Sequence, residues 1–144
     1  MKALKLLSSI LMITFFSCSG NAQEKNITTS TKKNQIEVID FYGTHRCTTC
    51  KAIEANAKYT VETYFVDEQK KGTVIFKTIN VDDAKNNAIS ESFEAAGTAL
   101  FLNVIKNGKE THINLTDFGF AKGKDKEVFT KELKLKIENE LKKL

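Results

Sequence analysis

The sequence contains no proline, no tryptophan and no long apolar run. Without proline, none of its loops can be built on a cis-proline. The first apolar run extends from Leu6 to Phe16 and is too short to cross a membrane, which takes roughly 20 residues. Basic residues do not cluster among aromatic ones, and the formal net charge is only +4. The charge pattern therefore gives no support to nucleic-acid binding.

Residues 1–17 are predicted to be a signal peptide. The segment begins with a positive region at Lys2 and Lys5, and the short apolar run follows at once. A positive start, a short apolar stretch and a small-residue end are typical of export signals. The alternative, a buried N-terminal helix, explains the basic start and the small-residue end less well.

Two cleavage sites compete after this leader. The stretch "FFSC" ends at Cys18 and resembles the lipobox of bacterial lipoproteins, with phenylalanines in place of its usual residues; ordinary cleavage after Ala22 is the rival. If Cys47 and Cys50 pair with each other, Cys18 would be an odd thiol unless it is lipidated or removed. We expect lipidation of Cys18, which predicts a membrane-anchored lipoprotein facing the periplasm, and a soluble periplasmic protein is the alternative. Both place the chain where disulfides persist.

Residues 18–34 are polar, lack apolar periodicity and are predicted to be a flexible tether. Residues 35–144 are enough for one domain with a core of its own. Its predicted strands, which are rich in β-branched and aromatic residues, are 35–43, 73–81, 99–105 and 110–115. Its predicted helices, which carry apolar residues at spacings of three and four, are 44–69, 82–97 and a final helix after a loop at 116–124.

The predicted element order is β-α-β-α-β-β-α. A helix between the first two strands allows them to lie parallel, and the Asn-Gly pair at 107–108 predicts an antiparallel hairpin. The fold class is therefore α/β, with a four-stranded mixed sheet flanked by helices. This order is that of the thioredoxin-like fold.

Cys47 and Cys50 are two residues apart where the first strand gives way to a helix. Unpaired N–H groups and the positive end of the helix dipole favour a thiolate at a helix start. His45, Arg46 and Lys51 add positive charge nearby. Two intervening residues place the second sulfur one turn further along, within reach of the first. Cys47 is the expected nucleophile of a redox-active disulfide, and Cys50 is the expected resolving cysteine.

Other roles for this pair stay open. A purely structural disulfide would close a very small loop and remove little entropy from the unfolded chain. Zinc usually takes four ligands, of which the pair supplies two, whereas copper(I) accepts two thiolates. His45 and His112 are expected to be solvated rather than metal ligands. A metal-binding chaperone and a non-catalytic binding module therefore remain alternatives.

Three stretches carry a resemblance to a known family. "VIDFYGTHRCTTC" (38–50) resembles the first strand and active-site turn of thioredoxin-like proteins, and "LFLNVIKNGKE" (100–110) resembles their later hairpin. More narrowly, "RCTTCKAIE" (46–54), the strand ending in "NGK" (107–109) and "LTDFGFA" (115–121) resemble a small exported thioredoxin-like group known as nitrophenyl-compound nitroreductase subunits. The resemblance covers residues 35–144 and implies a CxxC dithiol that exchanges disulfides.

The resemblance also assigns a role to Asp40. Thioredoxins carry a buried acid on this strand, one residue closer to the cysteine pair than Asp40, that helps to deprotonate the resolving cysteine, and the resemblance implies that Asp40 fills this role. The alternative is a strand-end carboxylate that faces solvent. The sequence departs from the family at the tryptophan before the first cysteine, which is Arg46 here, and at the intervening pair, which is Thr48-Thr49. The loop that would hold the family's cis-proline is expected near residues 97–100, and the missing proline raises the weight of the metal hypothesis.

Together these features predict an exported thiol–disulfide oxidoreductase that requires no other cofactor. Its expected partners are protein thiols or disulfides of the cell envelope. A reductase in this compartment would need a membrane electron donor. We expect a monomer that contacts the membrane through its lipid anchor and does not bind nucleic acid.

Overall fold

The computed structural model describes residues 33–144. The predicted signal peptide, Cys18 and residues 18–32 of the tether lie outside the described residues. The elements, in chain order, are β1 (Gln35–Tyr42), α1 (Thr48–Tyr64), α2 (Val66–Lys70), β2 (Val74–Asn80), the short 3-10 helix η1 (Ala84–Asn86), α3 (Asn87–Ser92), β3 (Ala99–Lys106), β4 (Lys109–Asn114), α4 (Thr116–Lys122) and α5 (Lys126–Leu141). Among residues 33–144, every helix is too short or too polar to cross a membrane.

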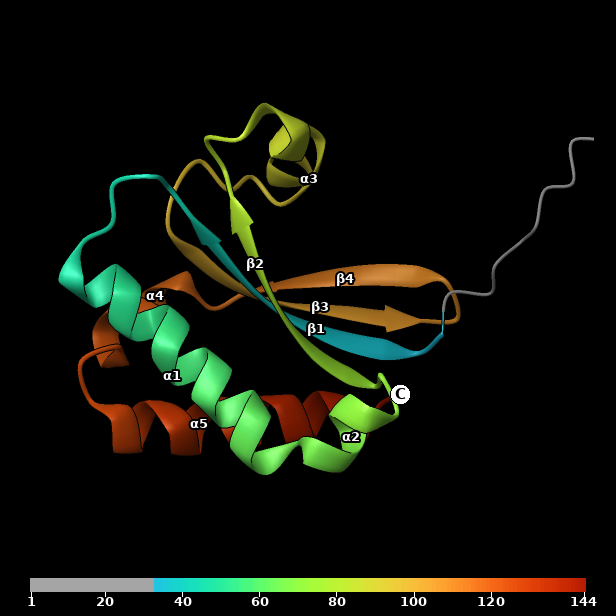
Figure 1. Cartoon of the computed structure of the whole chain (residues 1–144). Helices are drawn as coiled ribbons and strands as arrows, with labels where there is room; N and C mark the ends of the chain where they lie inside the picture. Colours follow the sequence, from blue (N-terminus) through green and yellow to red (C-terminus); the bar gives the residue numbers. More distant parts are fainter. Residues whose placement is uncertain (1–32) are drawn as a thin grey trace, which may run out of the picture.

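The four strands form one mixed sheet in the order β2-β1-β3-β4. β1 runs parallel to β2 and antiparallel to β3, and β4 runs antiparallel to β3 (Figure 1). The hairpin between β3 and β4 turns at Asn107 and Gly108, which both have positive φ, 51° and 78°. Two such residues make the turn that suits a tight hairpin. The predicted α/β class and the four-stranded mixed sheet flanked by helices are confirmed, and the arrangement is consistent with a thioredoxin-like one.

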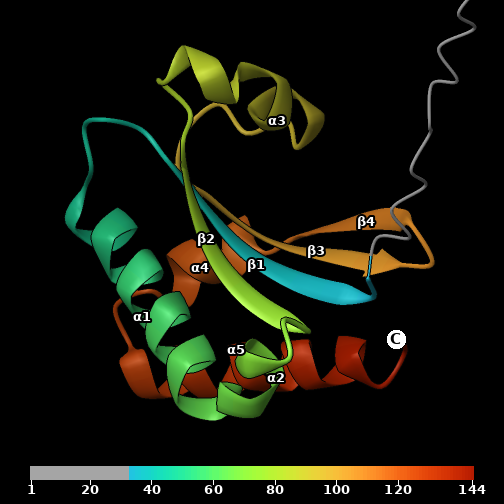
Figure 2. The same cartoon turned by 45° about the vertical axis from the view of Figure 1, so that its right-hand side comes forward.

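Helices cover both faces of the sheet, and alternation along β1 divides the core between them. Ile36 and Val38 point to the face covered by α1, α4 and α5, where the larger apolar cluster lies. Ile39 and Phe41 point to the opposite face, where a smaller cluster packs around Phe93 next to α3. Figures 1 and 2 show α3 alone on one side and the other helices on the opposite side. Each fully buried aliphatic side chain contributes roughly 1.5–3 kcal/mol to holding these layers together.

The helices differ from the prediction in extent. The segment 44–69, predicted as one helix, is divided, because Phe65 is buried and leaves helical geometry at φ −126° and ψ 35°. The segment 82–97 is helical only over η1 and α3, and Glu94 with φ 53° lies after their end. Tertiary burial of Phe65 thus overrides the helical periodicity of the first segment.

The prediction of a loop at 116–124 is wrong, because Thr116–Lys122 form the helix α4. Its two glycines suggested a loop, yet Gly119 and Gly123 are buried against Ile53 of α1. A Cβ atom on Gly123 would lie 2.8 Å from Cγ1 of Ile53 and 2.6 Å from the carbonyl oxygen of Gly119. The glycines are there for a close helix approach, not for a turn.

Candidate functional site

The first turn of α1 presents the cysteine pair. Cys47 is the N-cap of the helix, with extended backbone angles, and its Sγ accepts a hydrogen bond of 3.0 Å from the N–H of Cys50. The carbonyl oxygen of Cys47 accepts from the N–H of Lys51 over 3.1 Å. Cys47 and Cys50 are joined by a disulfide, with their Cα atoms 5.0 Å apart, and the pair fits a CxxC redox motif.

The two sulfur-bearing residues differ in their access to solvent. Cys47 is exposed, together with Thr48, at the start of the helix. Cys50 is only 7% exposed and is followed one turn later by the buried Ile53. A partner molecule can therefore approach Cys47, whereas Cys50 lies behind it.

Asp40 lies on β1, on the face that α1 covers. It is fully buried, so the alternative of a solvent-facing carboxylate is wrong. Burial raises the pKa of Asp40 from 3.8 to about 7, against a lowering by the charge and hydrogen bond of Arg46 and with a further raising by Glu54. The side chain can therefore change its protonation state near neutral pH.

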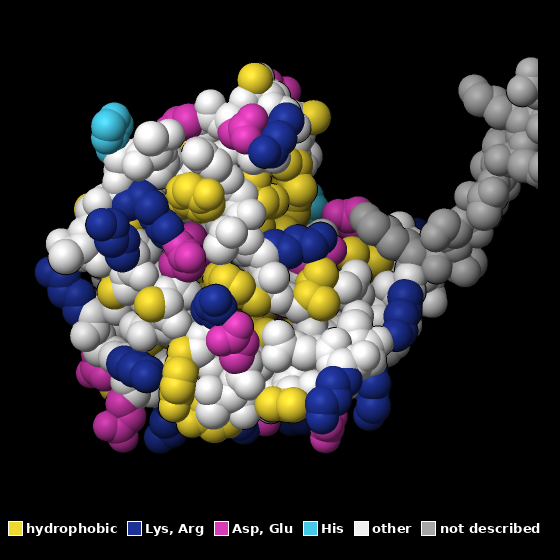
Figure 3. Space-filling view, viewed as in Figure 1, with side chains coloured by type: hydrophobic (Ala, Val, Ile, Leu, Met, Phe, Trp, Pro, Cys, Tyr) yellow, Lys and Arg dark blue, Asp and Glu magenta, His cyan; other side chains and the backbone are white. Residues whose placement is uncertain are grey.

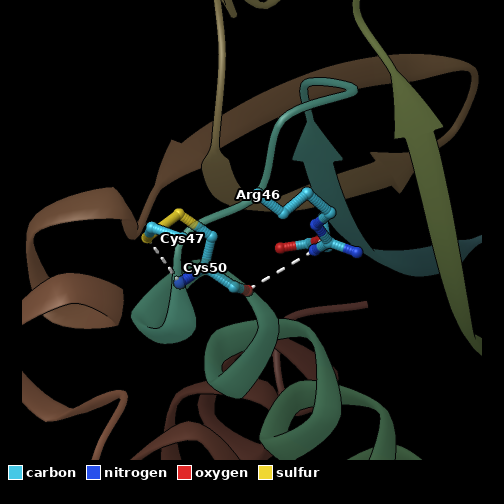
Figure 4. The surroundings of a disulfide bond; sticks show 4 residues. Arg46, Cys47 and Cys50 are labelled. Carbon is cyan, nitrogen blue, oxygen red and sulfur yellow. Dashed lines mark hydrogen bonds and ion pairs between the residues drawn. A yellow bond between two sulfur atoms is a disulfide. The ribbon is translucent and has the colours of Figure 1, made fainter.

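Arg46 connects this acid to the helix. Its guanidinium donates to Oδ2 of Asp40 over 3.1 Å, to the carboxylate of Glu54, and to the carbonyl oxygen of Cys50 over 3.4 Å. It also lies over the ring of Tyr42, with Cζ 4.5 Å from the ring centre. Figure 4 shows the side chain of Arg46 directed away from the two sulfurs. The sequence suggested only that Arg46 adds positive charge near the cysteines, whereas two carboxylates share that charge.

Two glycines bring α4 against the helix that carries the cysteines. A Cβ on Gly123 would lie 3.4 Å from Cγ2 of Thr49, the second of the intervening residues. The side-chain amide of Asn56 donates to the carbonyl oxygen of Gly123 over 2.9 Å. Helix α4 therefore covers one side of the first turns of α1. The spacing of Gly119 and Gly123 was the sequence signal that could have indicated this close contact between the two helices.

The loop before β3 emerges at the same end of the sheet as the cysteine turn. Phe41, near the end of β1, pairs with Ala99 at the start of β3. All peptide bonds that the structure describes are trans, including those near Gly97 and Thr98. These two residues line a groove of about 480 Å³ whose other side is formed by Asn114 and Asp117. Of the residues expected in this loop, Gly97 and Thr98 lie in it, whereas Ala99 and Leu100 belong to β3, and a groove lies along the loop.

A second groove, of about 520 Å³, lies between α1 and α5. Tyr59, Tyr64 and lysines of α5 line it. It follows the C-terminal half of α1, whereas the cysteines are at the N-terminal end, so it is separate from the disulfide.

The histidines do not join the cysteines. His112, on β4, stacks on the ring of Phe93 with the ring centres 3.6 Å apart, and His45 is exposed in the turn. Within residues 33–144, no three side chains of histidine, cysteine, aspartate or glutamate are grouped so that they could hold a metal ion. Figure 3 shows basic and acidic side chains interspersed over the visible face, with hydrophobic side chains below α3.

Comparison with known proteins adds little to this geometry. No family model matches the chain, and no curated protein matches it. One solved structure, described as the structure of a malarial protein, is 14% identical over 62% of this chain and 96% of its own, with a TM-score of 0.39. So low a likeness carries no argument about function.

Proposed function

We propose that the protein is an exported thiol–disulfide oxidoreductase that works on protein partners in the cell envelope. The observation that carries the proposal is a CxxC disulfide at a helix start, with an exposed first cysteine and a buried second one. An exposed sulfur at a helix start favours attack, and a buried neighbour one turn away favours resolution.

The reductive half-reaction begins with the thiolate of Cys47. It attacks one sulfur of a partner disulfide, forms a mixed disulfide and releases the other partner sulfur as a thiolate. Cys50 then gives its proton to Asp40, and its sulfur attacks Sγ of Cys47. The mixed disulfide breaks, the second partner thiolate leaves, and the Cys47–Cys50 disulfide forms. Two electrons have passed from the dithiol to the partner, and the reverse sequence oxidises a partner dithiol.

Turnover as a reductase needs a source of electrons outside the cytoplasm. A membrane dithiol donor that reduces the Cys47–Cys50 disulfide would close the cycle, and an anchor at Cys18 would keep the domain near it. The groove beside Gly97 and Thr98 is the place where we expect the partner's backbone to lie.

Trapping with Cys50→Ala tests the proposal. This variant keeps the nucleophile but cannot resolve, so it should accumulate mixed disulfides with envelope proteins and lose turnover on a disulfide peptide. The matched control is Cys47→Ala, which should accumulate few. Equal trapping by both variants, or no disulfide exchange by the unmodified protein, would reject the proposal. Stoichiometric copper or zinc on the reduced protein, without exchange activity, would instead favour the metal-chaperone alternative.

A further inference from the structure

Arg46 joins groups from two separate elements next to the cysteine pair. Asp40 belongs to β1, whereas Glu54 and the carbonyl oxygen of Cys50 belong to α1, and the guanidinium donates to all three. The Nε atom of Arg46 and the Oδ1 atom of Asp40 are both buried, and neither has a hydrogen-bond partner within the part of the chain that the structure describes. The contact between Arg46 and Asp40 is therefore a single hydrogen bond, not a two-pronged one.

One cation thus serves two carboxylates. The Arg46 side chain is 16% exposed, that of Glu54 is 29% exposed and that of Asp40 is fully buried. Asp40 feels the attraction of Arg46 and the repulsion of Glu54, and its neighbours across the sheet, Thr78 and Leu100, carry no charge. The protonation state of Asp40 therefore depends on how the charge of the Arg46 guanidinium is divided between Asp40 and Glu54.

We propose that Arg46 is a positioning residue that favours the ionised form of Asp40, the form that can accept the proton of Cys50, and that Glu54 limits this effect by sharing the guanidinium. The inference rests on the proposed function and adds a control element to the same site.

The sharing also solves a problem of charge in the resolving step. When Asp40 takes the proton of Cys50, Arg46 loses its ionised partner in a largely buried position, and an uncompensated buried charge is unfavourable. Glu54 remains bonded to the same guanidinium and compensates it. The proton can therefore move without leaving Arg46 unpaired, and the hydrogen bond to the carbonyl oxygen of Cys50 keeps the guanidinium in place.

The test compares Arg46→Gln and Glu54→Gln in the full-length chain. The titration midpoint of the Asp40 carboxyl is measured by carbon NMR on oxidised protein, which requires no activity. The resolving rate is measured against pH as the release of thionitrobenzoate from a mixed disulfide of Cys47 with that aromatic thiol. Lys51→Gln is the control, since Lys51 is an exposed basic residue beside Cys50.

Arg46→Gln should raise the Asp40 midpoint by about one pH unit or more, and the resolving rate near neutral pH should fall about tenfold. Glu54→Gln should move the Asp40 midpoint and the midpoint of the pH–rate profile the opposite way, and Lys51→Gln should leave the Asp40 midpoint in place. A structural role for Arg46 would not give opposite shifts in the two variants.

The outcomes distinguish the proposed disulfide exchange from the proposed control of Asp40 by Arg46 and Glu54. If the Asp40 midpoint does not move in Arg46→Gln or Glu54→Gln, or moves as much in Lys51→Gln, the inference is overturned. It is also overturned if the Asp40 midpoint moves and the rate profile of an active protein does not follow. If the unmodified protein forms no mixed disulfide, the proposed function fails, and the NMR midpoints still decide whether Arg46 and Glu54 control Asp40. Should Arg46→Gln fail to fold, the downward shift in Glu54→Gln remains a required result.

Discussion

The N–H of Cys50 donates a hydrogen bond to Sγ of Cys47 over 3.0 Å. The first sulfur thus caps the helix that carries the second, and it lies where unpaired N–H groups and the helix dipole stabilise negative charge. Cys50 is itself buried. Burial disfavours a thiolate because the charged form loses its hydration. The two thiols of the reduced protein should therefore differ in reactivity.

We predict that limiting iodoacetamide near neutral pH labels Cys47 of the reduced protein before Cys50. Peptide mapping by mass spectrometry gives the ratio of the two products. Cys50→Ala should keep the fast reaction, and Cys47→Ala should lose it. Equal labelling of both cysteines would remove the assignment of nucleophile and resolving residue.

Asp40 predicts an unusual pH dependence of stability. Its pKa in the fold, about 7, is raised above the ordinary value of 3.8, so the folded protein holds this proton more tightly than the unfolded chain does. The stabilisation is complete below the unfolded pKa and is lost as the pH rises through the folded one. From the two pKa values the loss is of the order of 4 kcal/mol between pH 3.8 and about 7.

Urea unfolding of the oxidised protein at a series of pH values measures this effect. Asp40→Asn cannot titrate, so its free energy of unfolding should fall less over this pH range than that of the unmodified protein. Asp67→Asn is the control, because it removes an exposed carboxylate whose side chain is 76% accessible, and it should leave the slope unchanged. Parallel curves for Asp40→Asn and the unmodified protein would contradict the burial argument.

The strands and the position of the cysteine turn could be predicted from the sequence because both depend on local patterns. β-Branched and aromatic residues mark the strands, and Asn107-Gly108 marks the hairpin. The helices were less predictable where tertiary contacts determine their ends and their packing. Phe65 ends α1 by turning into the core, and Gly123 is set by a contact with Ile53, which is distant in sequence.

In the candidate site, too, local sequence patterns could be interpreted in advance, whereas contacts between distant residues could not. The spacing of Cys47 and Cys50 identified the pair, and the resemblance to thioredoxins pointed to Asp40 as a buried acid on the first strand, where it is fully buried. The role of Arg46 could not be predicted, because its partners depend on the way the chain folds back after β1. A basic residue beside a cysteine suggests an effect on the thiolate, but the side chain binds carboxylates on the other side of the turn.

This sharing of Arg46 bears on the reduction potential. With its charge shared by Asp40 and Glu54, the helix start remains the main stabiliser of the Cys47 thiolate. We predict a potential between those of thioredoxin and disulfide isomerase, roughly −270 to −180 mV. Equilibration with glutathione buffers, followed by alkylation and mass measurement, gives the value. A potential near that of a strong oxidase would show that other charges stabilise the thiolate.

The lipid anchor is a separate prediction that depends on the sequence alone. We expect Cys18 to be acylated and to form the mature N-terminus, since the short apolar run ends at "FSCS". Mass spectrometry of the N-terminal peptide from the membrane fraction tests this, and Cys18→Ser should release the protein from that fraction. A mature chain that starts at Gln23 without lipid would support the soluble alternative.

The contact between α4 and α1 predicts which glycine cannot be replaced. In Gly123→Ala, the new Cβ would meet the carbonyl oxygen of Gly119, within α4, at 2.6 Å and Cγ1 of Ile53, on α1, at 2.8 Å, so the end of α4 would have to distort and shift away from the cysteine-bearing helix. Overpacking of this kind costs about 1–3 kcal/mol.

Gly97→Ala is the matched control, because a Cβ atom on Gly97 would meet no atom of residues 33–144 within 4 Å, and the φ of Gly97 is not positive. Its free energy of unfolding should change by no more than about 0.5 kcal/mol. Chemical denaturation followed by circular dichroism compares the two variants. Because Gly123 also lies against Thr49, Gly123→Ala should in addition speed alkylation of Cys50 in the reduced protein, whereas Gly97→Ala should not. Equal stability of the two variants would mean that α4 is not held against α1 as the structure has it.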